Sequence, residues 1–389
     1  MSATSDYWAP AQHFSVGFDI YLTGVLTHIH QGPYSLASAP EQRGQDAREA
    51  RVESIHDLVG SSDHEQIMNK YERTIEQNRE AAAVAPDDIA ERVARLKRER
   101  DAVVLAHYYV PAETQALADY VGDSFYLARL ARTLDCWTIV LCGVSFMAES
   151  VKLLNPERRV LLPEPNADCP MAHMVRKQDV DAVRERYDDL AVVCYINSTA
   201  EIKTWSDVCV TSSNALKVVR ELPQKNILFI PDMNLGRYVA ELVPEKNFVL
   251  NRGYCPTHQR IIPAEVERLE DEHPNAEVLA HPECTEEILR EADYIGSTKQ
   301  IIERIAASEK DEFIVLTVEG VSYEIGRLTH GQNKRIYFPA TTPICPNMAR
   351  VTPEKLLRSL EEGYGKVGMP GDADRANAPL EKMLELAAK

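Results

Sequence analysis

The sequence predicts an α/β protein with three pseudo-equivalent three-layer αβα sandwich domains, whose parallel sheets surround one central site. Three observations support this fold class: a polar pattern that recurs three times, a Cys-Pro pair in each copy, and apolar runs that alternate with amphipathic segments. Continuous apolar strands between helices are typical of parallel sheets that helices cover on both faces.

The recurring polar pattern lies at the front of each copy. An apolar run ends at His107, Tyr195 or His281, an aspartate follows twelve residues later at Asp119, Asp207 or Asp293, and a hydroxyl follows after five more at Ser124, Ser212 or Thr298. Two spacings that hold without slippage in three copies argue against coincidence. Self-similarity at a fixed period therefore sets the domain organisation before any local pattern does.

The elements of the first copy follow from its apolar runs and helix starts. We predict strands over 103–109, ending at 122–124, over 138–144 and over 159–163, with helices from Pro111 to near Tyr120, over 124–132 and over 146–154. Residues 227–232, 235–243 and 248–250 repeat the second half of this order, as do 313–318, 321–328 and 336–339. Amphipathic helices over 87–100, from Pro353 and over 380–388 flank the three copies.

The chain of 389 residues suits two to four domains. We predict an N-terminal extension at 1–85, repeats at 86–180, 181–268 and 269–350, and C-terminal helices at 351–389. The extension shows no sustained period and is interpreted as solvated and partly disordered. Its His28 and His30 form an H-x-H pair that could bind a metal, but no third ligand accompanies them.

Composition restricts the partners and the compartment. A net charge of −17 argues against nucleic-acid or anionic-membrane binding, so an anionic substrate would need a local positive site. No segment approaches the roughly 20 apolar residues of a spanning helix, and the N-terminus lacks a secretory signal. Eight cysteines without disulfide-type spacing predict a reducing, cytoplasmic protein.

Three of the cysteines share the period of the repeat. Cys169, Cys255 and Cys345 each precede a proline, lie 86 and 90 residues apart, and fall 62, 60 and 64 residues after the three anchors. The same arithmetic rejects Cys142, because the equivalent positions hold Ile230 and Leu316, which cannot bind metal. Cys142 is therefore predicted to be a buried strand residue, and Cys194, Cys209 and Cys284 buried thiols. For Cys284, which adjoins Glu283, a place close enough to the site to matter is the alternative. Three ligands at a site that normally takes four leave one position open for chemistry.

Three thiolates suit either zinc or an iron–sulfur cluster. A single zinc ion needs its ligands within a few ångström, which is demanding for three separate domains, whereas a cubane is larger. Cys-Pro also ends a known cluster-binding run. We favour a [4Fe–4S] cluster, one per chain, with one iron open to substrate, acting as a Lewis acid that removes water from a chelated substrate.

Acid–base and hydrogen-bonding groups lie near the predicted strand ends, where parallel sheets bind ligands. They are His107, Tyr109, Tyr195, Asn197, His281 and Glu283, together with His258, which follows Cys255 by three residues. Glu283 is the one carboxylate at a strand end and the candidate general base, with a pKa raised by enclosure. Tyr109 is interpreted as a proton donor or relay, with a packing role as the alternative.

The hydroxyls of Ser124, Ser212 and Thr298 are predicted at helix starts. Each would either cap its helix, which is worth about 1 kcal/mol, or hold an anion against the free amides. Three hydroxyls in register favour anion binding by at least two of them.

Six segments connect the chain with a known family. AHYYVPAETQALADYVGDS, GVSFMAESVKLLNP, YINSTAEIKTWSDVCVTSSNA, FIPDMNLGRYVAE, HPECTEEILREADYIGST and CPNMARVTPEKL occur in this order within about residues 90–389 and resemble the quinolinate synthase family. The resemblance implies that iminoaspartate and dihydroxyacetone phosphate condense to quinolinate, with release of phosphate and two waters, in de novo NAD biosynthesis.

The resemblance also implies roles for particular residues. It implies a [4Fe–4S] cluster on Cys169, Cys255 and Cys345 and catalytic roles for Tyr109, Glu283, His107 and His281. It implies substrate contacts from His107, Ser124, Tyr195, Asn197, Ser212, His258, His281, Glu283 and Thr298. It further implies a functional partner, L-aspartate oxidase, which would supply iminoaspartate.

Three other functions compete with this interpretation. A zinc hydrolase would use the same cysteines, and a hydratase would use a cluster like that of aconitase. Metal analysis distinguishes a zinc hydrolase from a cluster enzyme. Dependence on two co-substrates distinguishes a condensing synthase from a hydratase. A redox- or iron-sensing protein would need a nucleic-acid-binding element with a basic face, which the sequence does not offer.

Overall fold

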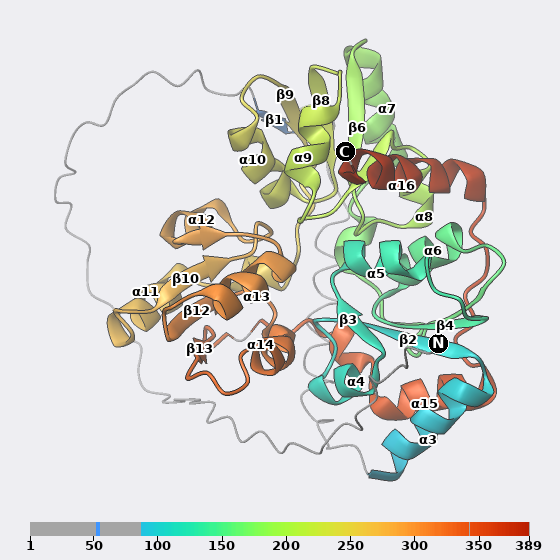
Figure 1. The fold of residues 1–389 in the computed structure, drawn as a ribbon. Coiled ribbons are helices and arrows are strands. Elements are labelled where there is room, and N and C mark those ends of the chain that lie inside the picture. The colour runs from blue at the N-terminus through green and yellow to red at the C-terminus, as the bar shows by residue number, and fades with distance from the viewer. Residues whose placement is uncertain (1–51, 55–86, 342, 389) are drawn as a thin grey trace, which may run out of the picture. The chain divides into compact units, whose positions relative to one another are not determined.

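The computed structural model describes residues 52–54, 87–341 and 343–388, which belong to one unit, Ala47–Lys389. His28 and His30 lie outside the described residues. Three parallel sheets flanked by helices confirm the predicted α/β class (Figure 1). The predicted domain boundaries remain a prediction.

The first sheet has the strand order β3-β2-β4-β5. Its strands are β2 (Ala102–His107), β3 (Tyr120–Gly122), β4 (Thr138–Cys142) and β5 (Arg159–Leu161), and the helices between them are α4 (Ala112–Leu117), α5 (Ser124–Ala131) and α6 (Ser145–Leu154). Helix α4 ends earlier than the predicted Tyr120, because the chain is already extended at Ala118. The strand-and-helix order of the first copy is otherwise as the sequence predicts.

The second and third sheets repeat this order. The second contains β6 (Leu190–Tyr195), β7 (Val208–Val210), β8 (Asn226–Ile230) and β9 (Asn247–Leu250), with α8 (Ala200–Lys203), α9 (Ala215–Glu221) and α10 (Met233–Leu242). The third contains β10 (Glu277–Ala280), β11 (Tyr294–Ile295), β12 (Glu312–Leu316) and β13 (Arg335–Tyr337), with α12 (Glu286–Glu291), α13 (Thr298–Ala307) and α14 (Ser322–Leu328). We call the chain around these sheets the first, second and third repeats.

In every repeat the first strand, β2, β6 or β10, lies between the second and the third strands of that repeat. The chain therefore turns one way to its second strand and the other way to its third. A crevice forms at such a switch point, outside the carboxyl end of the first strand. His107 and Tyr195 end β2 and β6, and His281 follows β10, so all three anchors lie where a ligand site is expected.

The repeated aspartates have a structural role in this arrangement. The carboxylates of Asp119, Asp207 and Asp293 accept the backbone N–H of Val104, Val192 and Val278 at 2.8, 2.7 and 3.0 Å. Each bond ties the start of the second strand to the first strand, fifteen residues earlier in the chain. The pattern that reveals the repeat is thus partly a requirement of the fold.

We expect Asp293→Ala to lower the free energy of unfolding by about 1 kcal/mol, because it leaves the Val278 N–H without its carboxylate. Asp293→Asn keeps an acceptor oxygen and is the matched control, with a smaller loss. Urea unfolding measures both. Equal stability of wild type and Asp293→Ala would contradict the structural role.

Five further α-helices of the described residues connect or close the repeats. They are α3 (Asp87–Glu99), α7 (Lys177–Arg186), α11 (Pro263–Glu272), α15 (Pro353–Glu362) and α16 (Ala373–Ala388). Helix α15 packs on α3 and α4, whereas α16 packs on α6, α8 and α9 and therefore joins the first and second repeats (Figure 1).

The apolar core is divided. One continuous cluster of buried side chains runs through the first and second repeats and includes α15 and α16. The third repeat has two clusters of its own, and Tyr108 of the first repeat packs into one of them. Because its clusters are separate, the third repeat shares fewer apolar contacts with the first and second repeats than those two share with each other.

The predicted extension contributes one strand that the sequence analysis missed. Strand β1 (Val52–Ser54) pairs in parallel with β9 at the edge of the second sheet. Three residues are too short for a periodic signal to reveal. Among the described residues, no helix combines the length and the apolar character that crossing a membrane requires.

Candidate active site

One cavity gathers residues from all three repeats. It contains about 750 Å³ of space unfilled by atoms, part of it open to solvent. Every predicted site residue except His258 lines it: His107, Tyr109, Ser124, Cys169, Tyr195, Asn197, Ser212, Cys255, His281, Glu283, Thr298 and Cys345. His107 and Cys345, which lie 238 positions apart in the sequence, thus line the same cavity.

Each predicted metal-ligating cysteine opens a tight turn that leads into a 3₁₀ helix. These short helices are Pro170–His173, His258–Arg260 and Met348–Arg350. The carbonyls of Cys169, Cys255 and Cys345 accept backbone N–H groups three or four residues later, at 3.0, 2.9 and 3.0 Å. A backbone fixed in this way holds each thiol at the cavity wall.

The three thiols form a suitable donor set for a metal group. All eight cysteines are free, and these three are partly buried. The other five are buried, four of them (Cys142, Cys194, Cys209 and Cys284) as predicted. Burial raises the pKa of Cys169, and the neighbouring Cys345, Asp168 and Glu283 raise it further. Burial likewise raises the pKa of Cys255 and Cys345. Binding a metal must therefore release protons from these thiols.

His107 and His281 have the same local geometry. The Nδ1 atom of His107 accepts the backbone N–H of Tyr109 at 3.2 Å, and that of His281 accepts the N–H of Glu283 at 3.3 Å. Burial lowers their pKa values to about 4 and about 3, against the opposing effect of Glu283. Both imidazoles are therefore neutral near pH 7, with the hydrogen on Nε2 as a donor.

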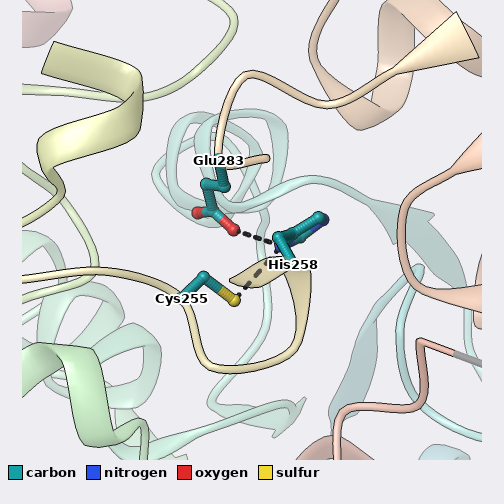
Figure 2. Close-up of side chains that lie close together, drawn as sticks. All are labelled: Cys255, His258 and Glu283. Carbon is teal, nitrogen blue, oxygen red and sulfur yellow. Dashed lines mark hydrogen bonds and ion pairs between the residues drawn. The ribbon is translucent and has the colours of Figure 1, made fainter. Parts of the chain in front are cut away.

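Glu283 is paired with His258, as Figure 2 shows. Its Oε2 lies 2.8 Å from Nδ1 of His258, which also lies 3.1 Å from Sγ of Cys255. Burial alone would raise the pKa of Glu283, but His258, His281 and Tyr195 lower it to about 2. The prediction of a raised pKa is therefore wrong, because attraction to the imidazoles outweighs desolvation.

His258 lies behind the cavity wall and is fully buried. Its Nε2 lies 3.0 Å from Oγ1 of Thr317, which in turn lies 2.8 Å from the Tyr109 hydroxyl. The same hydroxyl lies 2.7 Å from Oγ1 of Thr298. Burial raises the pKa of Tyr109, and so does Glu283, so the phenol stays protonated at neutral pH. Sequence reasoning missed Thr317, although a hydroxyl at the end of a buried strand was a usable signal.

The predicted helix-start hydroxyls do not act as caps in the two longer helices. Asp123 caps α5 by accepting the Tyr126 N–H, and Ser297 caps α13 in a capping box with Gln300. Ser124 and Thr298 are the first residues inside these helices, and Ser212 precedes α9 by three residues. All three residues line the cavity, and the hydroxyls of Ser124 and Thr298 leave the capping of their helices to the preceding residues.

The cavity lining contains no lysine or arginine among the residues that the structure describes. The expectation of a local positive site is therefore not met by charged side chains at the wall. Neutral donors take their place: imidazole Nε2–H groups, hydroxyls and helix-start amides. Asn197 lines the cavity, and its buried Oδ1 has no hydrogen-bond partner within the described part of the chain.

A second possible metal group overlaps the first. Cys255, His258 and Glu283 bring one ligand atom each within 4.8 Å of the others (Figure 2). This set would suit a single ion such as zinc. A metal ion on this set would replace the hydrogen between His258 and Glu283 and would use Cys255. It is therefore an alternative to a metal group on the three cysteines.

Comparisons with known proteins agree with the sequence motifs. The sequence model of a family described as Quinolinate synthetase A protein matches residues 91–385. A quinolinate synthase of Fusobacterium nucleatum is 51% identical over 298 residues, which cover 76% of this chain and 99% of the relative. Quinolinate synthases of Caldicellulosiruptor saccharolyticus and Aquifex aeolicus are 43% and 41% identical, over 77% of this chain and 99% and 94% of the relatives.

Proposed function

Because the chain belongs to the quinolinate synthetase A family, we propose that its cavity is the active site of a quinolinate synthase of NAD biosynthesis. The reaction condenses iminoaspartate with dihydroxyacetone phosphate to quinolinate and releases phosphate and two waters. The observation that carries the proposal is the meeting of one cysteine from each repeat with the ionised Glu283 at one cavity.

Cys169, Cys255 and Cys345 would hold a [4Fe–4S] cluster. Their place at one wall and their origin in three separate loops suit a cubane better than a single ion. When bound, the cluster supplies a Lewis-acidic iron with a position open to substrate. Nδ1 of His258 lies 3.1 Å from the Cys255 sulfur and 2.8 Å from Oε2 of Glu283, so its one hydrogen would be shared between the two and would tune that ligand.

The two substrates are anions, and neutral donors would bind them. Ser124 and Thr298 lie in the first turns of α5 and α13, where free amides and the helix dipole favour a carboxylate or a phosphate. The Nε2–H groups of His107 and His281 add two further donors. Ser212, Tyr195 and Asn197 complete the substrate contacts.

Glu283 and Tyr109 would move protons. Glu283 is ionised at neutral pH and can accept a proton from a substrate carbon or nitrogen. Tyr109 remains a phenol and can donate a hydrogen bond or a proton to a developing oxyanion. Glu283 and Tyr109 line the same cavity, so Glu283 can accept a proton from a bound substrate to which Tyr109 donates one.

Iminoaspartate hydrolyses readily in water, so an enzyme that oxidises aspartate must supply it promptly. We infer that L-aspartate oxidase is the functional partner and that both work in the cytoplasm. Nucleic acid and membrane are not expected as partners of a chain with a net charge of −17.

The test is metal analysis and an assay on the same sample. Protein purified without oxygen is expected to contain about four irons and four sulfides per chain, and to form quinolinate only when both substrates are present. Quinolinate formation without iron, or zinc that persists after reconstitution with iron, would overturn the cluster assignment. A cluster with no quinolinate would instead favour a hydratase-type dehydration.

A further inference from the structure

The start of helix α10 joins the second repeat to the loop that carries Glu283. Asn234, which is buried in the first turn of α10, donates from Nδ2 to the main-chain carbonyl of Glu283 at 3.0 Å. Three residues further along the same face of the helix, the Arg237 guanidinium lies 3.5 Å from the Glu286 carboxylate. The two contacts place α10 against residues 283–286 of the third repeat, and the buried one meets the candidate general base.

The end of α10 that holds Asn234 is itself fixed. Asp232 caps the helix by accepting the Leu235 N–H at 2.8 Å. A Cβ at Gly236 would lie 2.8 Å from Cδ2 of Leu250, which ends β9, so α10 lies directly on its own sheet. The Asn234 amide is therefore held by a rigid helix end.

The main chain around Glu283 is held from two sides. Within its loop, the Glu283 N–H donates to Nδ1 of His281 at 3.3 Å, and the Cys284 N–H donates to the His281 carbonyl at 2.9 Å. The Glu283 carbonyl instead bonds to Asn234 of the second repeat, while its carboxylate lies 2.8 Å from His258 (Figure 2). We propose that Asn234 is a positioning residue that fixes the Glu283 main chain and thereby the direction of the carboxylate. The inference rests on the proposed function, in which Glu283 is the base.

The repeat does not require an amide at this position. Asn234 follows the end of β8 by four residues, and Phe146 and Gly320, which follow β4 and β12 by four, have no side-chain donor. Gly320 nevertheless contacts the next repeat in the same way, because a Cβ there would lie 2.9 Å from Cα of Tyr109. Tyr109 and Glu283 each follow the anchor histidine of their repeat by two residues. Equivalent joints between repeats thus meet both proton-moving residues, and at Glu283 the contact is a hydrogen bond.

Two variants on the same helix face separate positioning from docking. Asn234→Leu removes the amide at similar size, and Arg237→Gln breaks the half-exposed neighbouring contact as the matched control. We expect Asn234→Leu to lower kcat by about 10–100-fold, because a misplaced base costs rate. The Kd for quinolinate should change by less than about threefold, and iron content should stay unchanged. Arg237→Gln should keep kcat within about twofold, since exposed ion pairs contribute little. Asn234→Ala replaces Asn234→Leu in every measurement if the larger side chain prevents folding.

The Glu283→Gln background shows whether Asn234 acts through the base. There we expect Asn234→Leu to lower kcat by less than about threefold, because a side chain that cannot accept the proton gains nothing from its direction. An equal factor in both backgrounds would indicate a general loss of structure and would overturn the proposal. So would a wild-type kcat in Asn234→Leu, or a fall in iron content that accounts for the lost rate.

Amide hydrogen exchange tests the same contact without catalysis. In Asn234→Leu, peptides that contain residues 281–286 should exchange faster than in wild type, with a smaller increase in Arg237→Gln. Unchanged exchange in Asn234→Leu would show that the bond does not hold the Glu283 main chain and would overturn the inference. If wild-type protein makes no quinolinate but exchange in this segment rises as expected, the proposed function fails while the positioning of Glu283 remains.

Discussion

Serine at any one of Cys169, Cys255 and Cys345 is expected to reduce iron from about four atoms per chain to below about one, and to abolish quinolinate formation. Each thiol comes from a different repeat, so no neighbouring cysteine can replace it at the cavity wall. A hydroxyl is a poor ligand for iron in a cluster that thiolates hold. Iron and sulfide analysis, with the visible absorption of the cluster, measures the loss.

Cys142→Ser is the control for these variants. Cys142 ends β4, is fully buried and lies outside the cavity lining. Its replacement leaves a hydroxyl in an apolar strand and should cost about 1–3 kcal/mol of stability while the iron is retained. Loss of iron in Cys142→Ser together with retention in Cys169→Ser would refute the ligand assignment.

Glu283→Gln is expected to lower kcat by about 10²–10⁴-fold, because the amide cannot accept a proton as the carboxylate does. The shape of the site should persist, since the amide oxygen can still accept from Nδ1 of His258. Steady-state kinetics with iron-matched samples measures the effect. An unchanged kcat would assign the base to another group, and a loss of iron would assign Glu283 to metal binding.

The acid stability of this variant provides a second readout. The pKa of Glu283 falls from 4.5 to about 2 on folding, so its carboxylate stabilises the fold above pH 4.5. This contribution disappears as the pH falls through about 2. Unfolding measured across this range should therefore depend less on pH in Glu283→Gln than in wild type. Parallel curves would contradict the pairing with His258.

The repeat arithmetic predicted the fold because the spacings have a structural cause. The aspartates that tie the second strand to the first must recur in each sheet, and the strand order places the anchors at one kind of crevice. Element types and the members of the cavity followed from this. The end of α4 and strand β1 could not be predicted in this way. A three-residue strand such as β1 has no readable period, and the chain leaves α4 for an extended backbone already at Ala118.

Electrostatics and connectivity were less predictable. The sequence identified Glu283 as a buried carboxylate but could not show that the Nδ1 atom of His258 lies 2.8 Å away, and this contact reverses the direction of the pKa shift. The contacts of Thr317 with Tyr109 and His258 join three repeats, which one-dimensional spacing does not contain. Similarly, the caps at Asp123 and Ser297 became visible only with backbone geometry.

The adjacent residues Tyr108 and Tyr109 have different surroundings. Tyr108 is embedded in an apolar cluster of the third repeat, whereas Tyr109 bonds to Thr298 and Thr317 of that repeat at the cavity. The main cluster contains no strand residue of the third sheet, and this dipeptide is one of the contacts that hold the third repeat against the first. Separation of the third repeat from the first would therefore remove the Tyr109 hydroxyl from Thr298 and Thr317. The proposed proton donor is held in place only while the third repeat packs on the first.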